Sequence, residues 1–170
     1  IDKVSAQNKR IVTDFYEGVF LKHKVKEYAD RYIGQQYIQH NPNVPDGKAP
    51  FVNFFTEKFQ KNPQAKNEIK RAIAEGNLVV LHVHSTENEK DRGRAIVDIF
   101  RVENGKIVEH WDNLQETPTN PNPSGHTMID GAAEARRQHD HLQDAGQLPR
   151  GRTHPSGVSA LYRVGQRQAL

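Results

Sequence analysis

Apolar residues recur at two different spacings along this chain. Over Val4–Leu21 they recur every three to four residues, which predicts an amphipathic helix. Shorter stretches with the same spacing predict helices over Val25–Ile33 and Ala49–Phe59, and the second of these is entered through Pro50. After the third helix the apolar and polar residues alternate, which is typical of half-buried strands.

The alternating part predicts four strands, over Lys66–Glu75, Leu78–Ser85, Arg94–Val102 and Lys106–Gln115. Asn104-Gly105 separates the last two, and this dipeptide favours a tight hairpin turn because both residues tolerate positive φ. A short extended piece, Tyr37–His40, lies between the second and third helices. Three helices followed by a run of antiparallel strands indicate an α+β fold with the helices on one face of the sheet.

Composition divides the chain near Gly131. Every lysine lies between Lys3 and Lys106, whereas residues 132–170 contain arginine and no lysine. The mean hydropathy of −0.84 is low for a compact domain. We therefore predict a folded unit over residues 1–131 and an Arg/Gln-rich appendage over 132–170, with a helix over Ala132–Ala145. The abrupt change fits a changed reading frame or a fused segment.

Charge and composition argue against several classes of protein. The net charge is +3, and no dense basic block alternates with aromatic residues, which disfavours nucleic-acid binding. No apolar run is long enough to span a bilayer. Cysteine is absent, which excludes disulfides and thiol chemistry. No signal peptide is visible. The compartment is open: the cytoplasm is favoured, and a secreted or periplasmic location is the alternative if a segment before Ile1 was removed.

Asp98 does not fit its strand. Aspartate is a poor strand former, yet Asp98 shares one face of the predicted strand with Ile96 and Phe100. Buried acids are usually paired, so one explanation is a structural partner such as Arg71 or Arg94. The other explanation is that the carboxylate belongs to a site.

Several histidines lie beside Asp98 in the predicted sheet. His82 and His84 share a face of one strand, and His110 and Asp112 share a face of another. A single histidine in a strand is more often a hydrogen-bonded core residue than a catalyst, and the register that decides which side chains meet is not evident. Because burying several ionisable groups is costly, the combination favours a functional site.

These residues carry a resemblance to a known family. The segments Tyr37–Pro42, Ala74–Val79, His82–His84, Val97–Arg101 and Glu109–Asp112 resemble the SnoaL-like polyketide cyclases, and more narrowly their predicted aldol-condensation-catalysing branch. The resemblance implies an NTF2-like cone, in which three N-terminal helices pack on a strongly curved antiparallel sheet around a pocket. It also implies a homodimer formed through the sheet.

The resemblance implies roles for particular residues. In such cyclases a strand aspartate serves as acid and base with a histidine nearby, which gives catalytic roles to Asp98, His82, His84 and His110. An acid in an apolar pocket is expected to have a raised pKa, which suits proton abstraction next to a carbonyl. A histidine would stabilise the enolate oxygen. The expected walls of the pocket are aromatic residues and one histidine: Tyr16, Tyr37, His40, Phe51, Phe55 and Trp111.

The leading hypothesis is therefore an enzyme that needs no cofactor or metal. It would act on a small, moderately hydrophobic carbonyl compound by aldol-type cyclisation, isomerisation or a related proton transfer. Three alternatives stay open: a hydrolase of epoxides or esters in the same pocket, a non-catalytic dimeric ligand-binding module, and a metal-dependent enzyme. The metal ligands would come from His40, His82, His84 and His110 with Asp98 or Asp112.

Overall fold

The computed structural model describes residues 1–132, and within them residues Ile1–Thr117 form one compact unit. The expectations for the appendage, including its helix, lie outside these residues apart from Ala132. The element order is α1 (Lys3–Phe20), α2 (Val25–Tyr32), β1 (Ile33–Gln39), α3 (Lys48–Lys61), β2 (Lys66–Glu75), β3 (Leu78–Thr86), β4 (Arg94–Glu103) and β5 (Lys106–Glu116). Each lies within a few residues of its predicted range, although β1 is longer than expected. The fold class, α+β, is confirmed.

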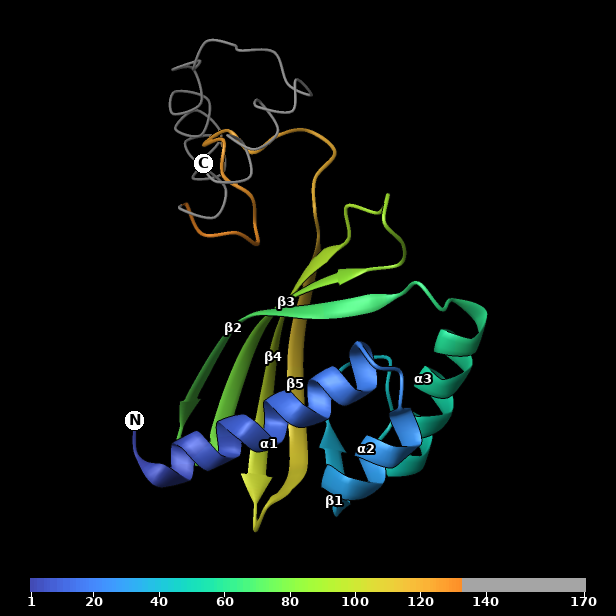
Figure 1. Ribbon diagram of the computed structural model, residues 1–170, viewed down its shortest axis with the longest axis vertical. Coiled ribbons are helices and arrows are strands. Elements are labelled where there is room, and N and C mark those ends of the chain that lie inside the picture. Colours follow the sequence, from blue (N-terminus) through green and yellow to red (C-terminus); the bar gives the residue numbers. More distant parts are fainter. Residues whose placement is uncertain (133–170) are drawn as a thin grey trace, which may run out of the picture. The chain divides into compact units, whose positions relative to one another are not determined.

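The five strands form one sheet in the order β1-β5-β4-β3-β2 (Figure 1). Strands β2 to β5 are antiparallel neighbours, as predicted. Strand β1, however, pairs parallel to β5. The expectation of a wholly antiparallel sheet is therefore wrong, and the sheet is mixed. A parallel partner needs a long crossover rather than a hairpin, and the whole chain from α3 to β4 lies between β1 and β5.

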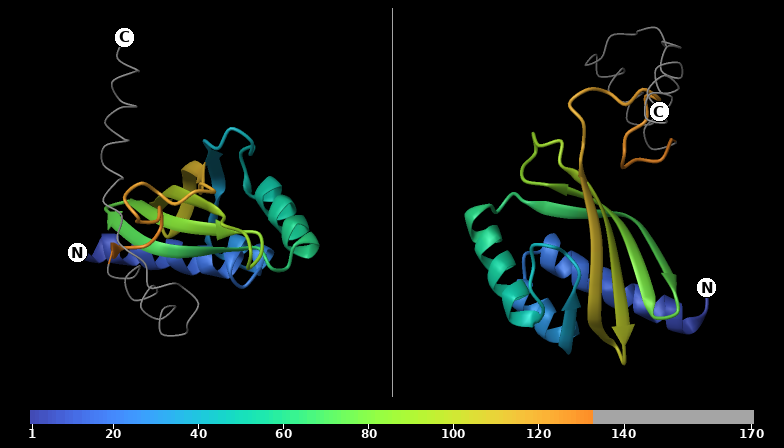
Figure 2. Two further views of the ribbon diagram at one scale, coloured as in Figure 1. Left: turned by 90° about the horizontal axis from the view of Figure 1, so that it is seen from above. Right: turned by 180° about the vertical axis from the view of Figure 1, so that it is seen from behind.

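Helix α1 lies across one face of the curved sheet, and the view from behind shows the opposite face of β4 and β5 without a helix over it (Figures 1 and 2). Asp2 is the N-cap of helix α1, and its carboxylate accepts a hydrogen bond of 2.9 Å from the Ser5 N–H. Its buried face, which includes Phe15, Tyr16 and Val19, packs in the core with Val79, Leu81 and Val83. The side chains of each strand therefore alternate between an inner face of the sheet, which lies toward α1, and an outer face.

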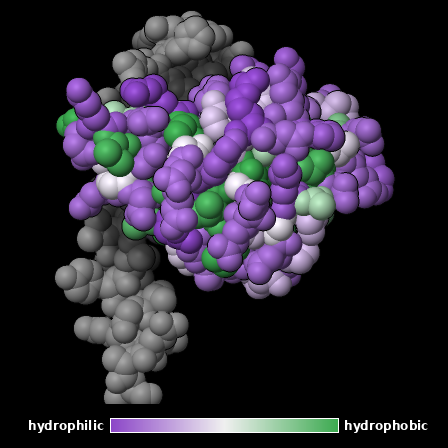
Figure 3. Space-filling view, turned by 90° about the horizontal axis from the view of Figure 1, so that it is seen from below, coloured by the Kyte–Doolittle hydropathy of each residue, from purple (hydrophilic) through white to green (hydrophobic). Residues whose placement is uncertain are grey.

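Hydrophobic side chains gather inside this unit. On the face shown in Figure 3 hydrophilic side chains predominate and apolar ones form only small patches. Within residues 1–132 no helix is both long and apolar enough to cross a membrane. The core has an aromatic wall, formed where α1 meets α3, in which the Phe20 ring contacts Phe51, Phe55 and Phe59 at centroid distances of 4.9–6.3 Å.

The close contact between α1 and α2 depends on Gly18. A Cβ at this position would lie 2.2 Å from the ring of Tyr28. We predict that Gly18→Ala lowers the free energy of unfolding by about 1–3 kcal/mol, because overpacking outweighs the better helix propensity of alanine. Urea unfolding measures the change. The control is Glu17→Ala at the neighbouring exposed position, whose free energy of unfolding should stay within about 0.5 kcal/mol of the parent value. A Gly18→Ala protein as stable as the parent would contradict the packing argument.

Candidate active site

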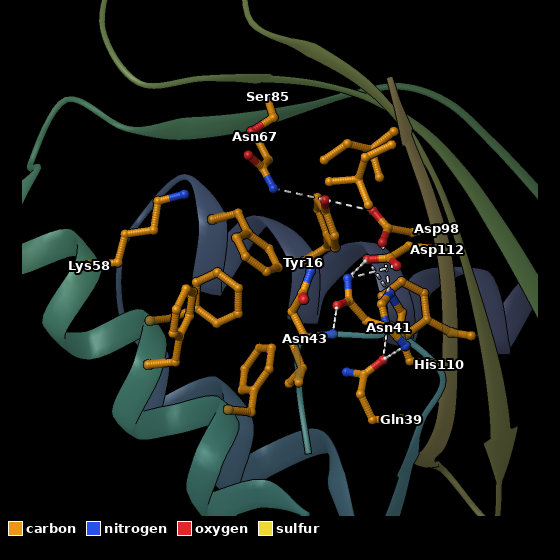
Figure 4. A pocket seen from close by; sticks show the side chains of 18 of the residues that line it. Tyr16, Gln39, Asn41, Asn43, Lys58, Asn67, Ser85, Asp98, His110 and Asp112 are labelled. Atoms are coloured by element: carbon orange, nitrogen blue, oxygen red, sulfur yellow. Dashed lines mark hydrogen bonds and ion pairs between the residues drawn. The ribbon is translucent and has the colours of Figure 1, made fainter. Parts of the chain in front are cut away.

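The inner face of the sheet and the aromatic wall enclose a cavity of about 350 Å³ (Figure 4). Apolar lining comes from α1, α3 and the strands, and includes Phe15, Phe20, Phe51 and Phe55. One polar group lies around the inner faces of β4 and β5. The residues there are Tyr16, Gln39, Asn41, Asp98, His110 and Asp112. Further polar residues line other parts of the wall: Asn43, Lys58, Asn67, Ser85 and Arg94. A mostly apolar pocket with a few convergent polar groups is the usual form of a small-molecule site.

Asp98 is 4% exposed and has two partners. The Tyr16 hydroxyl, which comes from α1, donates to its Oδ2 at 2.8 Å. His110 Nε2, which comes from β5, lies 2.7 Å from its Oδ1. Asn67 Nδ2 donates in turn to the Tyr16 oxygen at 3.0 Å. The acid on an apolar strand face is therefore paired, and its partners are Tyr16 and His110 rather than Arg71 or Arg94.

The protonation of His110 follows from its neighbours. The Asn41 backbone N–H donates to Gln39 Oε1 at 3.1 Å, which places the amide oxygen of Gln39, and not its nitrogen, at this position. His110 Nδ1 lies 2.7 Å from the same oxygen and must therefore donate to it. On the other side of the ring, Nε2 faces a carboxylate at hydrogen-bond distance. A proton is consequently shared between His110 Nε2 and Asp98 Oδ1, whichever of the two atoms carries it.

Asp112 is the second carboxylate at this wall. It lies directly opposite Asp98 in the β4–β5 register. Asn41 Nδ2 donates to its two oxygens at 2.9 and 3.0 Å, and its Oδ2 lies 3.9 Å from His110 Nε2. One ligand atom each from Asp98, His110 and Asp112 can lie within 4.8 Å of the other two. The group consists of one histidine and two carboxylates. Its nitrogen and oxygen atoms suit a divalent metal as well as proton transfer.

The structure does not bring His82 and His84 to this site. Both lie on the outer face of β3, because Leu81 and not His82 is opposite Asp98. Arg71 donates to His82 Nδ1 at 3.1 Å, and His84 Nε2 donates to the Arg92 carbonyl at 2.8 Å. The expectation that these two histidines lie beside Asp98 is therefore wrong.

His40 and Trp111 also lie away from the cavity. Their rings stack on each other at a centroid distance of 4.9 Å, and His40 Nε2 lies 2.7 Å from Glu109 Oε2. The hydrogen bonds from His40 and Arg101 hold the pKa of Glu109 below its ordinary value. The expected placement of these two rings in the pocket wall is wrong, whereas Tyr16, Tyr37, Phe51 and Phe55 do line it.

Sequence reasoning missed the pocket roles of Gln39, Asn41 and Asn67, and it named Asp112 only as a possible metal ligand. Asp112 had a signal, since it shares a strand face with His110. Gln39 and Asn41 lie in the Tyr37–Pro42 segment that carries the resemblance, but no pattern assigned them to the pocket. They reach the site only through the parallel pairing of β1 with β5, in which Gln39 is opposite His110.

Three helices on one face of a curved sheet with a pocket against them form an NTF2-like fold. The chain belongs to the SnoaL-like domain family, whose family model matches residues 12–110. The narrower resemblance to the aldol-condensation branch stays a prediction.

Solved structures support the same fold. A provisionally assigned polyketide cyclase from Acidithiobacillus ferrooxidans is similar over 67% of this chain and 92% of its own, at 18% identity and a TM-score of 0.54. A provisionally assigned ketosteroid isomerase from Kribbella flavida is similar over 75% and 93%, at 15% identity and a TM-score of 0.57. An NTF2-like protein of unknown function from Mesorhizobium loti is similar over 68% and 96%, at 19% identity and a TM-score of 0.56. No curated protein matches the chain in sequence.

Two buried tyrosines predict how stability depends on pH. Burial first, and then the charge of Asp98, raise the pKa of Tyr16 and of Tyr37 well above the ordinary value of 10.0. Above pH 10.0 the unfolded chain loses these protons while the folded chain keeps them, so the free energy of unfolding should fall as the pH rises. Urea unfolding between pH 9 and 11 measures this fall, which Tyr37→Phe should reduce. An unchanged pH dependence in Tyr37→Phe would contradict the assignment.

Proposed function

We propose that the protein catalyses proton transfer next to the carbonyl group of a small, moderately hydrophobic molecule. The observation that supports this most is the buried Asp98–His110 pair, which shares a proton at the wall of a mostly apolar cavity. General acid–base catalysis needs such a group within reach of the reacting atoms. Aldol-type cyclisation and double-bond isomerisation both begin with this step.

Tyr16 supports the proposed chemistry from α1. Its hydroxyl donates its one proton to Asp98 Oδ2 at 2.8 Å and so fixes the direction of the carboxylate. A reacting group that is held in one direction loses little freedom when a ligand binds, which favours catalysis. The Asn67 side chain, which donates to the Tyr16 oxygen, holds this hydroxyl in place.

Exchange of hydrogen for deuterium tests the proposal without knowledge of the natural substrate. The protein should accelerate deuterium uptake from D₂O at the carbons beside the carbonyl of 2-tetralone, a small bicyclic ketone, measured by NMR. Asp98→Asn should lower the protein-catalysed rate about 100-fold or more. Glu109→Gln is the control, because it removes a carboxylate from the outer face of β5 and should leave the rate unchanged.

Failure of the wild-type protein to accelerate exchange in 2-tetralone, cyclohexanone and 1-indanone alike would contradict the proposal.

A metal-dependent reaction is the second candidate, favoured by the closeness of ligand atoms from Asp98, His110 and Asp112. The proposal expects the exchange rate to survive treatment with EDTA. Loss of exchange in EDTA and its return with added Zn²⁺ would replace acid–base catalysis with metal catalysis.

We also propose that two copies of the chain pair through the outer face of the sheet. An apolar row crosses four strands there in register, made of Ile73, Val80, Ile99 and Trp111. Ile73 is 64% exposed in the single chain, although isoleucine is among the residues most often buried. A second copy presenting the same row would cover it symmetrically.

Light scattering after size-exclusion chromatography measures the oligomeric state. The parent should have the mass of a dimer, and Ile73→Lys should have the mass of a monomer, because it places a charge in the apolar row. Lys66→Glu on the same strand serves as a charge-changing control and should leave the dimer intact. A monomeric parent, or a dimer that survives Ile73→Lys, would contradict this interface.

A further inference from the structure

A row of polar residues crosses the inner face of the sheet at one end of the cavity. Asn67 on β2 is opposite Ser85 on β3, and Ser85 is opposite Arg94 on β4. All three residues of this polar row line the cavity. On β4, Arg94 lies four residues before Asp98 on the same face, which separates their Cα atoms by about 13 Å. The polar row is therefore a second polar region of the cavity, besides the Asp98–His110 pair.

The Ser85 hydroxyl is enclosed and has no protein partner. Ser85 is 4% exposed and lines the cavity. Among residues 1–132 its side chain makes no hydrogen bond, although every fully covered polar side-chain atom in that range has a partner. The Ser85 oxygen is therefore open to the cavity. Buried hydroxyls are usually hydrogen-bonded, so this one favours a ligand at that place.

Two cations lie near the Ser85 hydroxyl. Arg94 is its neighbour in the polar row, and Lys58 comes from α3, where its Nζ lies 3.1 Å from Oε1 of Glu87, two residues after Ser85. Figure 4 shows the Lys58 side chain pointing from α3 toward the side of the cavity that holds Asn67 and Ser85. The side chains of Lys58 and Arg94 are 25% and 36% exposed. A partly buried cation attracts an anion more strongly than a fully exposed one.

Both cations keep hydrogen-bond donors for a ligand. Within residues 1–132, the ion pair of Arg94 joins its Nε to the exposed Glu116 at 4.0 Å. Such a pair is weak and leaves the two terminal nitrogens of the guanidinium available. Lys58 has three N–H donors, and its ion pair with Glu87 occupies one of them. A guanidinium matches the two oxygens of a carboxylate, so the available donors suit that group.

An apolar strip separates the two polar regions of the cavity. Ile96 lies between Arg94 and Asp98 on the inner face of β4, and its partner in register, Leu114, follows Asp112 on β5. Both apolar residues line the cavity. The Asp98 and Asp112 carboxylates repel an anionic group, whereas Arg94 attracts one. A ligand with a carboxylate at one end is therefore held in one direction along the cavity.

We propose that Arg94, Lys58 and the Ser85 hydroxyl bind a carboxylate group of the substrate. The inference rests on the proposed function for the other end of the molecule, a ketone carbonyl near the Asp98–His110 pair. The substrate class is thus a keto acid, in which an apolar body separates the carboxylate from the carbonyl. This body lies along the apolar strip.

Binding of two fluorescent naphthols tests the carboxylate site without any reaction. 6-Hydroxy-2-naphthoate has a hydroxyl at one end and a carboxylate at the other, and 2-naphthol lacks the carboxylate. Fluorescence titration at pH 7 should show that the parent binds 6-hydroxy-2-naphthoate at least fivefold more tightly than 2-naphthol. Arg94→Gln and Lys58→Gln should each lower this ratio of dissociation constants at least threefold, because each removes a charged donor to the carboxylate.

Two substitutions are the matched controls. Lys61→Gln and Arg92→Gln remove the same charges from exposed positions that do not line the cavity, and both should keep the ratio of the parent. An equal fall of the ratio in these controls would mean that the overall charge attracts the anion, and it would overturn the inference. A ratio below fivefold in the parent, or a ratio that neither Arg94→Gln nor Lys58→Gln lowers, would also overturn it.

Deuterium uptake distinguishes failure of this inference from failure of the proposed function. In the parent, 6-carboxy-2-tetralone should have a KM at least fivefold below that of 2-tetralone, and Arg94→Gln should reduce this difference. Equal KM values in the parent would overturn the keto acid as substrate and leave the proposed function in place. A binding ratio as expected, without exchange in either ketone, would overturn the proposed function and leave the carboxylate site in place.

Discussion

The hydrogen bonds to the buried Asp98 carboxylate join three elements of this protein. Tyr16 comes from α1, Asp98 from β4 and His110 from β5, and the three side chains meet inside the apolar core. A buried ion without partners would cost several kcal/mol, so the helix and both strands must be in place together for the site to be stable. The site is therefore part of the protein's core as well as the proposed place of proton transfer.

Strand β1 extends this network from the edge of the sheet. Because it runs parallel to β5, its last residue, Gln39, reaches His110, and the following loop brings Asn41 to Asp112. The backbone N–H of Asn41 orients the Gln39 amide, and that amide determines which imidazole nitrogen donates. A backbone hydrogen bond in a loop thus determines that His110 Nδ1 donates to Gln39 and that Nε2 faces Asp98.

The two faces of the sheet carry different chemistry. On the inner face, Asp98 and His110 alternate with buried apolar residues and meet the cavity. On the outer face, His82 contacts Arg71, and Glu109 contacts both His40 and Arg101. The ionisable groups on the outer face stay in contact with water, so their hydrogen bonds are ordinary surface interactions.

The sequence by itself determined the three helices, the four antiparallel strands and the α+β class, because helix and strand periodicities are local properties of the chain. It also identified Asp98 as a residue at odds with its surroundings, and His110 with Asp112 as neighbours on one face. Only the tertiary structure decided which histidine meets Asp98. Strand register sets that choice, and a shift by one residue would have exchanged His82 for Leu81. The pairing of β1 with β5, and with it Gln39 and Asn41, depends on contacts between residues far apart in sequence, which no local pattern contains.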